Sequence, residues 1–273
     1  MKKIGILFLG LISAFSFSQN TRFVYQVSMK TDSTAVPKIE NAYLDISTEK
    51  SIFYGEKRMK RDSTIRQAME TRNFNFDRNS MEQFRTAITY SIEKNHATKT
   101  ISYKDRIARD QYWYDEDRTF NWKILPETVK IGEYETQKAE TTFAGRKWFA
   151  WFTQDLPFID GPYKFSGLPG LIVKVEDEKG DYSFDLKETK KIAELPNFES
   201  RFGNNIKVKR SEFLKQQEKF NKDPMSFFQN QGGGFAMRMG GNQNPQNEAE
   251  RRKMMEERLK EEAKANNNPL EKN

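Results

Sequence analysis

Cysteine is absent from the 273-residue chain, and histidine occurs once, as His96. Without cysteine there is no disulfide framework and no thiol to carry a lipid. Zinc and other transition-metal sites draw on several Cys and His side chains, so one histidine argues against such a site. The sequence also lacks P-loop, Rossmann, HExxH and GxSxG fingerprints. We therefore expect no metal, no cofactor and a surface position for His96.

Long apolar runs are missing except at the start, where Ile4–Phe17 follows two lysines. This run is too short to span a bilayer. Small residues precede Gln19, as at a signal-peptidase cut. We expect residues 1–18 to be a secretory signal peptide that directs the chain to the periplasm or outer envelope, without a lipid anchor. The alternative is that this segment stays attached as an N-terminal anchor.

A strong excess of one charge is also missing. The chain has 46 Lys and Arg against 39 Asp and Glu, a formal net charge of +7; residues 1–18 hold two lysines and no acid, so their removal leaves +5. An excess this small and dispersed does not fit nucleic acid as a partner. The local exception is the basic run Lys57–Arg61, which favours an anionic membrane surface or an outer-membrane protein as partner.

Short stretches of alternating apolar and polar residues are numerous, and this period of two is typical of half-buried strands. They lie at 23–29, 42–46, 51–54, 99–103, 111–114, 120–124, 137–143, 147–153, 171–176 and 181–186. Short strands between turn residues predict a mainly β fold, an antiparallel meander curled into a half-barrel, a barrel or a sandwich. The charged stretch 55–80 is expected to be an excursion from this sheet, partly helical from Ser63 to Arg72.

The C-terminal part has a different composition. Residues 211–220 predict a short helix, residues 229–247 are a Gly/Asn-rich linker, and residues 248–264 predict a charged helix with too few apolar side chains to bury a face. We expect a β domain over 19–228 and a disordered or helical charged tail over 229–273. The few large apolar residues of this tail predict that it is solvated and dispensable for stability.

The stretch Lys147–Thr153 is apolar on both faces, with Trp148 and Phe152 on one side and Phe149 and Trp151 on the other. A strand of this kind is normally covered on both sides. The four tryptophans, at 113, 122, 148 and 151, all lie on expected strands. They form either an aromatic ligand site or simply the core, and both interpretations stay open.

Residues 161–172, GPYKFSGLPGLI, combine three glycines and two prolines with five large apolar side chains. Glycine adopts backbone conformations and close approaches that other residues resist, and proline fixes the backbone. The apolar side chains predict that this loop folds down onto the core, either as a rigid entry to the next strand or as the edge of a binding site. Gly170 is expected at a positive φ or at a close backbone approach.

The hexapeptide Gly167–Ile172 resembles the sequence that names the GLPGLI family of exported proteins of Bacteroidota. Four further stretches resemble the rest of that family's central pattern: QKA at 137–139, GR at 145–146, AWFT at 150–153 and GPYKF at 161–165. The resemblance extends over about residues 21–225 and leaves the tail outside. It implies an exported envelope protein, and it implies no catalytic residue, because the family has no established activity.

Three functions remain open. The first is a binding or carrier module for an apolar small molecule or an envelope partner, with its site in and before the glycine-proline loop. The candidate binding residues are Trp148, Trp151, Asp155, Tyr163, Lys164, Phe165, Leu168 and Pro169. The second is a purely structural or interaction protein at the outer membrane, which the basic run and the charged tail favour.

The third function is a hydrolase in which Asp155 and Asp160 act as general acid and base. The alternative for these carboxylates is a structural role in which they hydrogen-bond the loop. In that case they are expected to pair with Lys164 or Arg146 if those cations are buried, because an unpaired buried charge is too costly. We assign no catalytic residue from the sequence.

Overall fold

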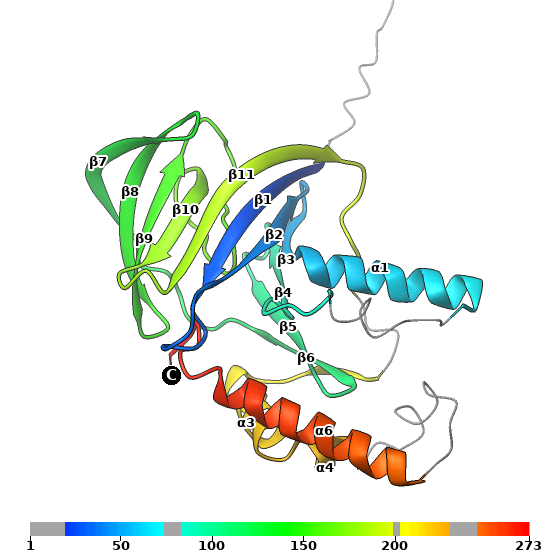
Figure 1. The fold of residues 1–273 in the computed structure, drawn as a ribbon. Coiled ribbons are helices and arrows are strands. Elements are labelled where there is room, and N and C mark those ends of the chain that lie inside the picture. Colours follow the sequence, from blue (N-terminus) through cyan, green and yellow to red (C-terminus); the bar gives the residue numbers. More distant parts are fainter. Residues whose placement is uncertain (1–19, 74–82, 199–202, 230–244, 273) are drawn as a thin grey trace, which may run out of the picture.

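The structure is a computed structural model of the chain, and it describes residues 20–73, 83–198, 203–229 and 245–272. The expected signal peptide and most of the expected linker lie outside these ranges. The mainly β prediction is confirmed within them, since the dominant feature is one large sheet (Figure 1).

Twelve strands of the described residues form this sheet, in the order β12-β6-β5-β4-β3-β2-β1-β11-β10-β9-β8-β7. Neighbouring strands are antiparallel, except that β12 runs parallel to β6. The strands are β1 Asn20–Met29, β2 Lys38–Ile46, β3 Lys50–Gly55, β4 Ser91–Asn95, β5 Ile101–Ile107, β6 Asp110–Asp115, β7 Lys123–Ile131, β8 Tyr134–Phe143, β9 Arg146–Thr153, β10 Leu171–Asp177, β11 Tyr182–Ile192 and β12 Asn205–Lys207.

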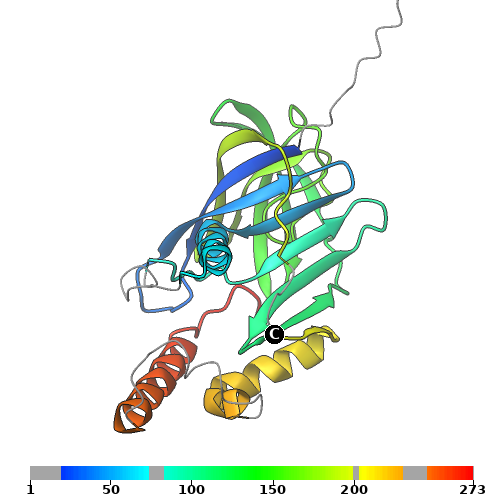
Figure 2. The same ribbon diagram turned by 90° about the vertical axis from the view of Figure 1, so that its right-hand side faces the viewer.

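The sheet consists of two meanders joined at one seam. Strands β1 to β6 follow one another on one side, strands β7 to β11 on the other, and β1 pairs with β11 between them. In this pairing Asn20 lies opposite Ile192 and Met29 opposite Tyr182. The sheet is strongly curled, but β12 and β7 remain separate edges, so it does not close into a barrel (Figure 2).

The described helices are α1 Glu56–Thr71, α3 Arg210–Lys222, α4 Pro224–Gln229 and α6 Pro245–Lys264. Helix α1 begins directly after β3, earlier than the partial helix predicted from Ser63, and it buries little beyond Arg58 and Ala68. Helices α3, α4 and α6 lie together at one end of the molecule (Figure 1). None of these helices is long and apolar enough to cross a membrane.

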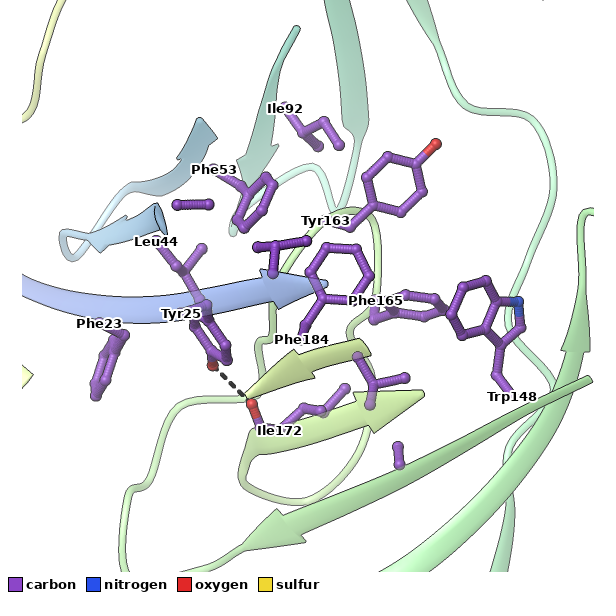
Figure 3. Close-up of a cluster of buried hydrophobic side chains, with 14 of the residues drawn as sticks. Phe23, Tyr25, Leu44, Phe53, Ile92, Trp148, Tyr163, Phe165, Ile172 and Phe184 are labelled. Atoms are coloured by element: carbon purple, nitrogen blue, oxygen red, sulfur yellow. Dashed lines mark hydrogen bonds between the residues drawn. The ribbon is translucent and has the colours of Figure 1, made fainter. Parts of the chain in front are cut away.

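The core lies on the concave side of the curled sheet, and the glycine-proline loop fills part of it (Figure 3). Phe165 is fully buried, with its ring centroid 4.8 Å from that of Trp148 and 6.2 Å from that of Phe184. The hydroxyl of Tyr25 donates a 2.6 Å hydrogen bond to the carbonyl of Ile172, where the loop enters β10. The prediction that this loop folds onto the core is therefore confirmed.

Gly170 marks the closest backbone approach of this loop. Its φ is +146°, and a Cβ atom at this position would lie 2.0 Å from the carbonyl oxygen of Thr153. Real Cβ atoms do not approach a backbone atom so closely, so only glycine lets β10 start beside the end of β9. Both alternatives offered for Gly170, a positive φ and a close approach, are present.

The outer face of β9 differs from the prediction. Phe149 and Trp151 are partly exposed and are covered by lysine side chains instead of a second layer of protein. The ammonium of Lys138 lies 4.6 Å from the ring centroid of Phe149, and that of Lys174 lies 5.0 Å from that of Trp151. Lysine stems can cover apolar surface while the charge stays in water. This explains why β9 carries aromatic residues on both faces although one face is in contact with solvent.

The expectation that the whole tail is solvated is wrong for its last residues. After α6 the chain returns to the sheet, where the backbone N–H of Asn268 donates to the carbonyl of Thr31 and that of Lys272 to the carbonyl of Ala144, both at 2.8 Å. Composition reflects only how much apolar surface a segment can bury, whereas this segment is held mainly by hydrogen bonds and ion pairs. The division into a domain and a tail near residue 229 stays a prediction.

Candidate functional site

Lys164, in the loop between β9 and β10, is fully buried. Its ammonium donates hydrogen bonds to Glu116 and Glu271, both at 2.6 Å, and to the hydroxyl of Tyr114 at 3.0 Å. Three tyrosine rings surround it, with centroids at 5.0, 5.1 and 5.4 Å. Burial alone would lower the pKa of this amine, but the charge of Glu271, with Tyr114 and Glu116, raises it above its ordinary value. The amine therefore stays charged inside the protein.

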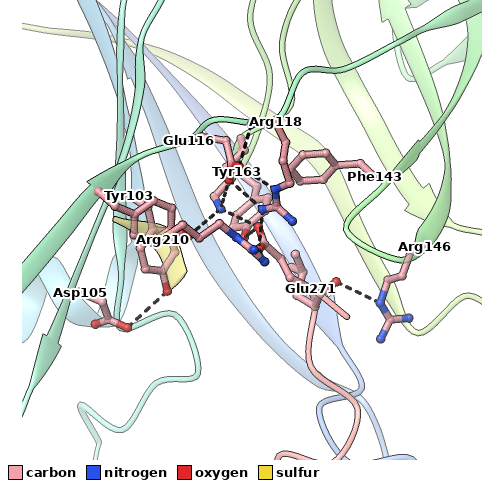
Figure 4. Close-up of polar contacts among 12 residues, drawn as sticks. Tyr103, Asp105, Glu116, Arg118, Phe143, Arg146, Tyr163, Arg210 and Glu271 are labelled. Atoms are coloured by element: carbon pink, nitrogen blue, oxygen red, sulfur yellow. Dashed lines mark hydrogen bonds and ion pairs between the residues drawn. The ribbon is translucent and has the colours of Figure 1, made fainter. Parts of the chain in front are cut away.

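Glu271, from the C-terminal segment, is the centre of this cluster (Figure 4). Its Oε1 accepts hydrogen bonds from Lys164 and from the hydroxyl of Tyr163, each at 2.6 Å. Its Oε2 accepts from Arg118 at 2.7 Å and from Arg210 at 3.3 Å. The groups come from three other parts of the chain: the β9–β10 loop, the connection after β6, and the start of α3.

The electrostatics keep both acids of the cluster ionised. Burial would raise the pKa of Glu271, but Lys164, Tyr163 and Arg118 lower it to about 2. The pKa of Glu116 is likewise lowered, because Arg118 and Lys164 outweigh its burial. Arg118 binds Glu116 through two nitrogens, at 2.7 and 2.8 Å. This paired, fork-like geometry is the strong form of an arginine–carboxylate contact.

Arg146 holds a second part of the same C-terminal segment. Its Nη2 donates to the side-chain oxygen of Asn268 at 2.7 Å and to the carbonyl of Pro269 at 2.8 Å, and its Nε donates to the carbonyl of Leu270 at 3.0 Å. Asp177 accepts from Nη1 at 2.7 Å and neutralises the guanidinium. One buried arginine thus contacts three consecutive residues of the segment.

A cavity of about 510 Å³ lies beside the cluster, between the concave face of the sheet, helix α3 and the C-terminal segment. Its walls include Tyr90, Tyr103 and Tyr114, whose rings stack in series with centroids 5.3 and 5.2 Å apart. Phe213 of α3 and Leu270 of the segment add apolar surface. The result is an aromatic cavity next to a set of buried charges.

Two carboxyl groups line this cavity away from the Lys164 cluster, Glu218 on α3 and Asp105 on the sheet. Asp105 of β5 lies on the cavity wall, where Thr89 donates a 3.0 Å hydrogen bond to it. Burial raises the pKa of the Asp105 carboxyl above its ordinary value, although the charge of Arg58 opposes the shift. A carboxyl group in this state is suited to contact a hydroxyl or amine of a bound molecule.

The structure brings only two of the eight candidate binding residues, Tyr163 and Lys164, to this site. Trp148, Phe165 and Leu168 are buried in the core. The other three lie elsewhere: Trp151 is on the outer face of β9, and Asp155 and Pro169 are exposed. The tryptophans do not form one aromatic site either, because Trp148 is in the core, Trp151 is on the outer face of β9 and Trp113 is on β6. The ammonium of Lys207 lies 4.4 Å from the ring centroid of Trp113.

Asp160 has a structural partner that the sequence did not suggest. Lys94 of β4 donates to the carboxylate of Asp160 at 2.5 Å and to the carbonyls of Gly161 and Phe165 at 2.6 and 3.0 Å. His96 lies with its Nε2 3.8 Å from the same carboxylate, which raises the pKa of the imidazole. The prediction that buried Lys164 or Arg146 would pair with Asp155 or Asp160 is therefore wrong.

Burial and ion pairs reduce the exposed positive charge of the basic run Lys57–Arg61 on α1. Arg58 is buried, with its guanidinium 4.7 Å from the ring centroid of Phe198. Lys60 pairs with Glu56 at 2.7 Å, and Arg61 with Asp62 at 3.2 Å. These pairs neutralise much of the charge that favoured an anionic surface as a partner.

Part of the site lies within the residues that match a family model. Residues 141–174 match the model of a family described as a protein of unknown function (Porph_ging). The matched residues include Arg146, Tyr163 and Lys164, which hold the C-terminal segment, but not the segment itself. No curated protein matches the chain.

Two solved structures of PNGF-II, titled by their P21 and C2 space groups, resemble this chain in fold. Their TM-scores are 0.53 and 0.54, with 18% and 17% sequence identity. The matches cover 72% and 74% of this chain and 33% of each PNGF-II chain. The chain thus spans about a third of the length of these relatives, and at this identity the likeness shows the fold alone.

Proposed function

We propose that this chain is an exported binding module that holds an apolar small molecule in the tyrosine-lined cavity. The observation that carries this proposal is the cavity of about 510 Å³ and its stacked rings of Tyr90, Tyr103 and Tyr114. Sites for small molecules have volumes of roughly 300–1,000 Å³ and are lined mainly by apolar and aromatic groups. The resemblance to the GLPGLI family and the expected signal peptide support a location in the periplasm or outer envelope.

The cavity lining defines the chemistry of the ligand. Aromatic rings favour an apolar molecule with a ring or chain that packs against them. Asp105, at the wall, favours one hydroxyl or amine on that molecule, because a buried carboxyl is stabilised by a hydrogen-bond partner. The α3 side of the cavity adds Gln217, Glu218 and Asn221, so the ligand class is an apolar molecule that also carries polar groups.

The cavity can be tested with a pair of substitutions on α3. Gln217 lines the cavity, whereas Lys219 is exposed. We expect the full chain to bind the apolar fluorophore anilinonaphthalene sulfonate, Gln217→Trp to weaken this binding at least about tenfold by filling the cavity, and the matched Lys219→Trp to leave it unchanged. Equal binding by the two variants, together with a native mass spectrum free of bound ligand for protein purified from its own cells, would exclude the cavity as the site.

A further inference from the structure

The C-terminal segment Asn268–Glu271 is held in the way that receptors hold short peptides. Arg146 donates to the Asn268 side chain and to the carbonyls of Pro269 and Leu270. The backbone N–H of Asn268 donates to the carbonyl of Thr31, two residues after the end of β1. Backbone contacts of this kind fix the position of an extended peptide, and side-chain contacts select its sequence.

The first position of the segment fits asparagine. The side-chain oxygen of Asn268 accepts from Arg146, and its amide nitrogen donates to the carbonyl of Lys30 at 2.7 Å. The hydroxyl of Tyr182 donates to the Asn268 carbonyl at 2.6 Å. Aspartate at this position could not donate to Lys30, and alanine could make neither side-chain bond.

The last position fits a carboxylate. Four separate groups donate to Glu271, and its side chain is 14% exposed (Figure 4). If Glu271 left, Lys164 and Arg118 would face Glu116 as the remaining carboxylate of the ion pairs described above. Lys164, Arg118 and Arg210 each lose an acceptor when Glu271 leaves, and such a group of cations favours an anion, because unpaired charge in a protein interior is costly.

The segment reaches this site along the outside of the molecule. It follows α6, which packs against α3 and α4 at the end of the sheet (Figure 1). Three of the residues that hold it, Arg146, Tyr163 and Lys164, belong to the part of the chain that matches a family model, whereas Arg118, Tyr182 and Arg210 lie outside that part. Receptor and occupant are thus separate parts of the sequence, joined by a long connection.

We propose that the groove formed by Arg146, Tyr163, Lys164 and Tyr182 is a receptor for an extended segment of the type Asn-Pro-apolar-Glu on a partner protein. The chain's own Asn268–Glu271 fills this receptor when the partner is absent. A partner segment of this type would make the same ion pairs and hydrogen bonds as the chain's own segment does. This site does not depend on a ligand in the tyrosine cavity, although the segment forms one wall of that cavity.

A tethered occupant competes strongly, since an intramolecular segment acts at an effective concentration of about a millimolar. The test therefore uses the full chain with its own segment weakened by Asn268→Ala and Glu271→Gln, and with all receptor residues unchanged. The probe is a fluorescein-labelled peptide NNNPLEKN, which has the sequence of residues 266–273. Binding is measured by fluorescence anisotropy.

We expect the weakened chain to bind this peptide at least about tenfold more tightly than the wild-type chain does. The matched peptide NNNPLQKN should bind the weakened chain about tenfold less tightly, because it lacks the carboxylate. Wild-type dimers that form at high concentration and dissociate on addition of peptide would support the receptor and identify a second copy as the partner. A folded, weakened chain that binds neither peptide at 1 mM, or binds both equally, overturns the proposal.

A second measurement covers the case in which the weakened chain does not fold. A specific protease site is placed at residues 261–265, at the end of α6, of the otherwise unchanged chain, and the chain is cleaved after folding, so that the released piece is held only through its contacts with the receptor. Displacement of the C-terminal piece by excess NNNPLEKN, but not by NNNPLQKN, supports a receptor with an exchangeable occupant. A piece that stays bound against both peptides shows that the segment is a permanent part of the fold and overturns the proposal.

Discussion

Two glycines of the loop before β10 allow the effect of backbone crowding to be measured apart from that of backbone conformation. Gly167 and Gly170 both have positive φ, +93° and +146°. Alanine in such a conformation costs roughly 1–2 kcal/mol. At Gly167 the new methyl group would meet nothing within 4 Å, whereas at Gly170 it would lie 2.0 Å from the Thr153 carbonyl oxygen and 2.6 Å from the Thr153 carbonyl carbon.

The added methyl at Gly170 must therefore push β9 and β10 apart, and overpacking of this kind costs roughly a further 1–3 kcal/mol. We expect Gly170→Ala to lower the free energy of unfolding by about 4 kcal/mol and Gly167→Ala by about 1 kcal/mol. At about 2–4 °C per kcal/mol for a domain of this size, the two melting temperatures should differ by about 10 °C.

The assay is thermal unfolding of both variants and the wild-type chain, followed by circular dichroism at one scan rate. Because the two substitutions are chemically identical and lie three positions apart, composition and unfolded-state effects largely cancel between them. Equal melting temperatures for Gly167→Ala and Gly170→Ala would refute the assignment of Gly170 to a crowded backbone site. A loss confined to Gly167→Ala would refute it as well.

Three further predictions concern buried polar contacts. Lys94→Met should destabilise the chain by about 3–5 kcal/mol in denaturant unfolding, because it removes the buried ammonium that pairs with the Asp160 carboxylate; an unchanged midpoint would contradict that pairing. Tyr25→Phe should cost about 1–2 kcal/mol in the same assay, since it leaves the Ile172 carbonyl without its donor, and a neutral result would mean that water replaces the hydroxyl. The pKa of Glu271 is about 2 against an ordinary 4.5, so its contribution, of about 3 kcal/mol at most, should be present above pH 4.5 and be lost as the pH falls toward 2. The stability difference between the wild-type chain and Glu271→Gln measures it, and a difference independent of pH from 7 to 3 would contradict the low pKa.

Much of the sheet could be predicted from the sequence, because most of its strands place alternate residues in the core. β1 is an example, with Phe23, Tyr25 and Val27 buried. Strand β4, Ser91–Asn95, was missed, since Ile92 is the only apolar residue among its five. It forms because β3 and β5 pair with it on both sides, and that tertiary support is not visible in the pattern of a single strand.

Only part of the site could be predicted from the sequence, because its long-range contacts are also not visible in a local pattern. Lys164 could be predicted as a site residue because it lies in an unusual loop, but its partners Glu116 and Glu271 lie in distant, charged stretches where nothing distinguishes them from the neighbouring acids. The sequence did offer one signal for the C-terminal segment: Pro269 and Leu270 interrupt a strongly polar tail. Single-sequence patterns report burial well and long-range ion pairs poorly, because pairing depends on where the chain is brought together.

The seam between β1 and β11 also sets an order of assembly. Each meander is made of neighbouring strands that can pair soon after they are synthesised. In contrast, β1 can pair with its second neighbour, β11, only after the chain has been synthesised as far as Ile192, which lies opposite Asn20. Contacts so distant along the chain slow folding and leave an unpaired strand edge exposed in the meantime. Products of interrupted synthesis that end before Tyr182 lack β11 altogether, so they should be the species most prone to aggregate and most dependent on chaperones.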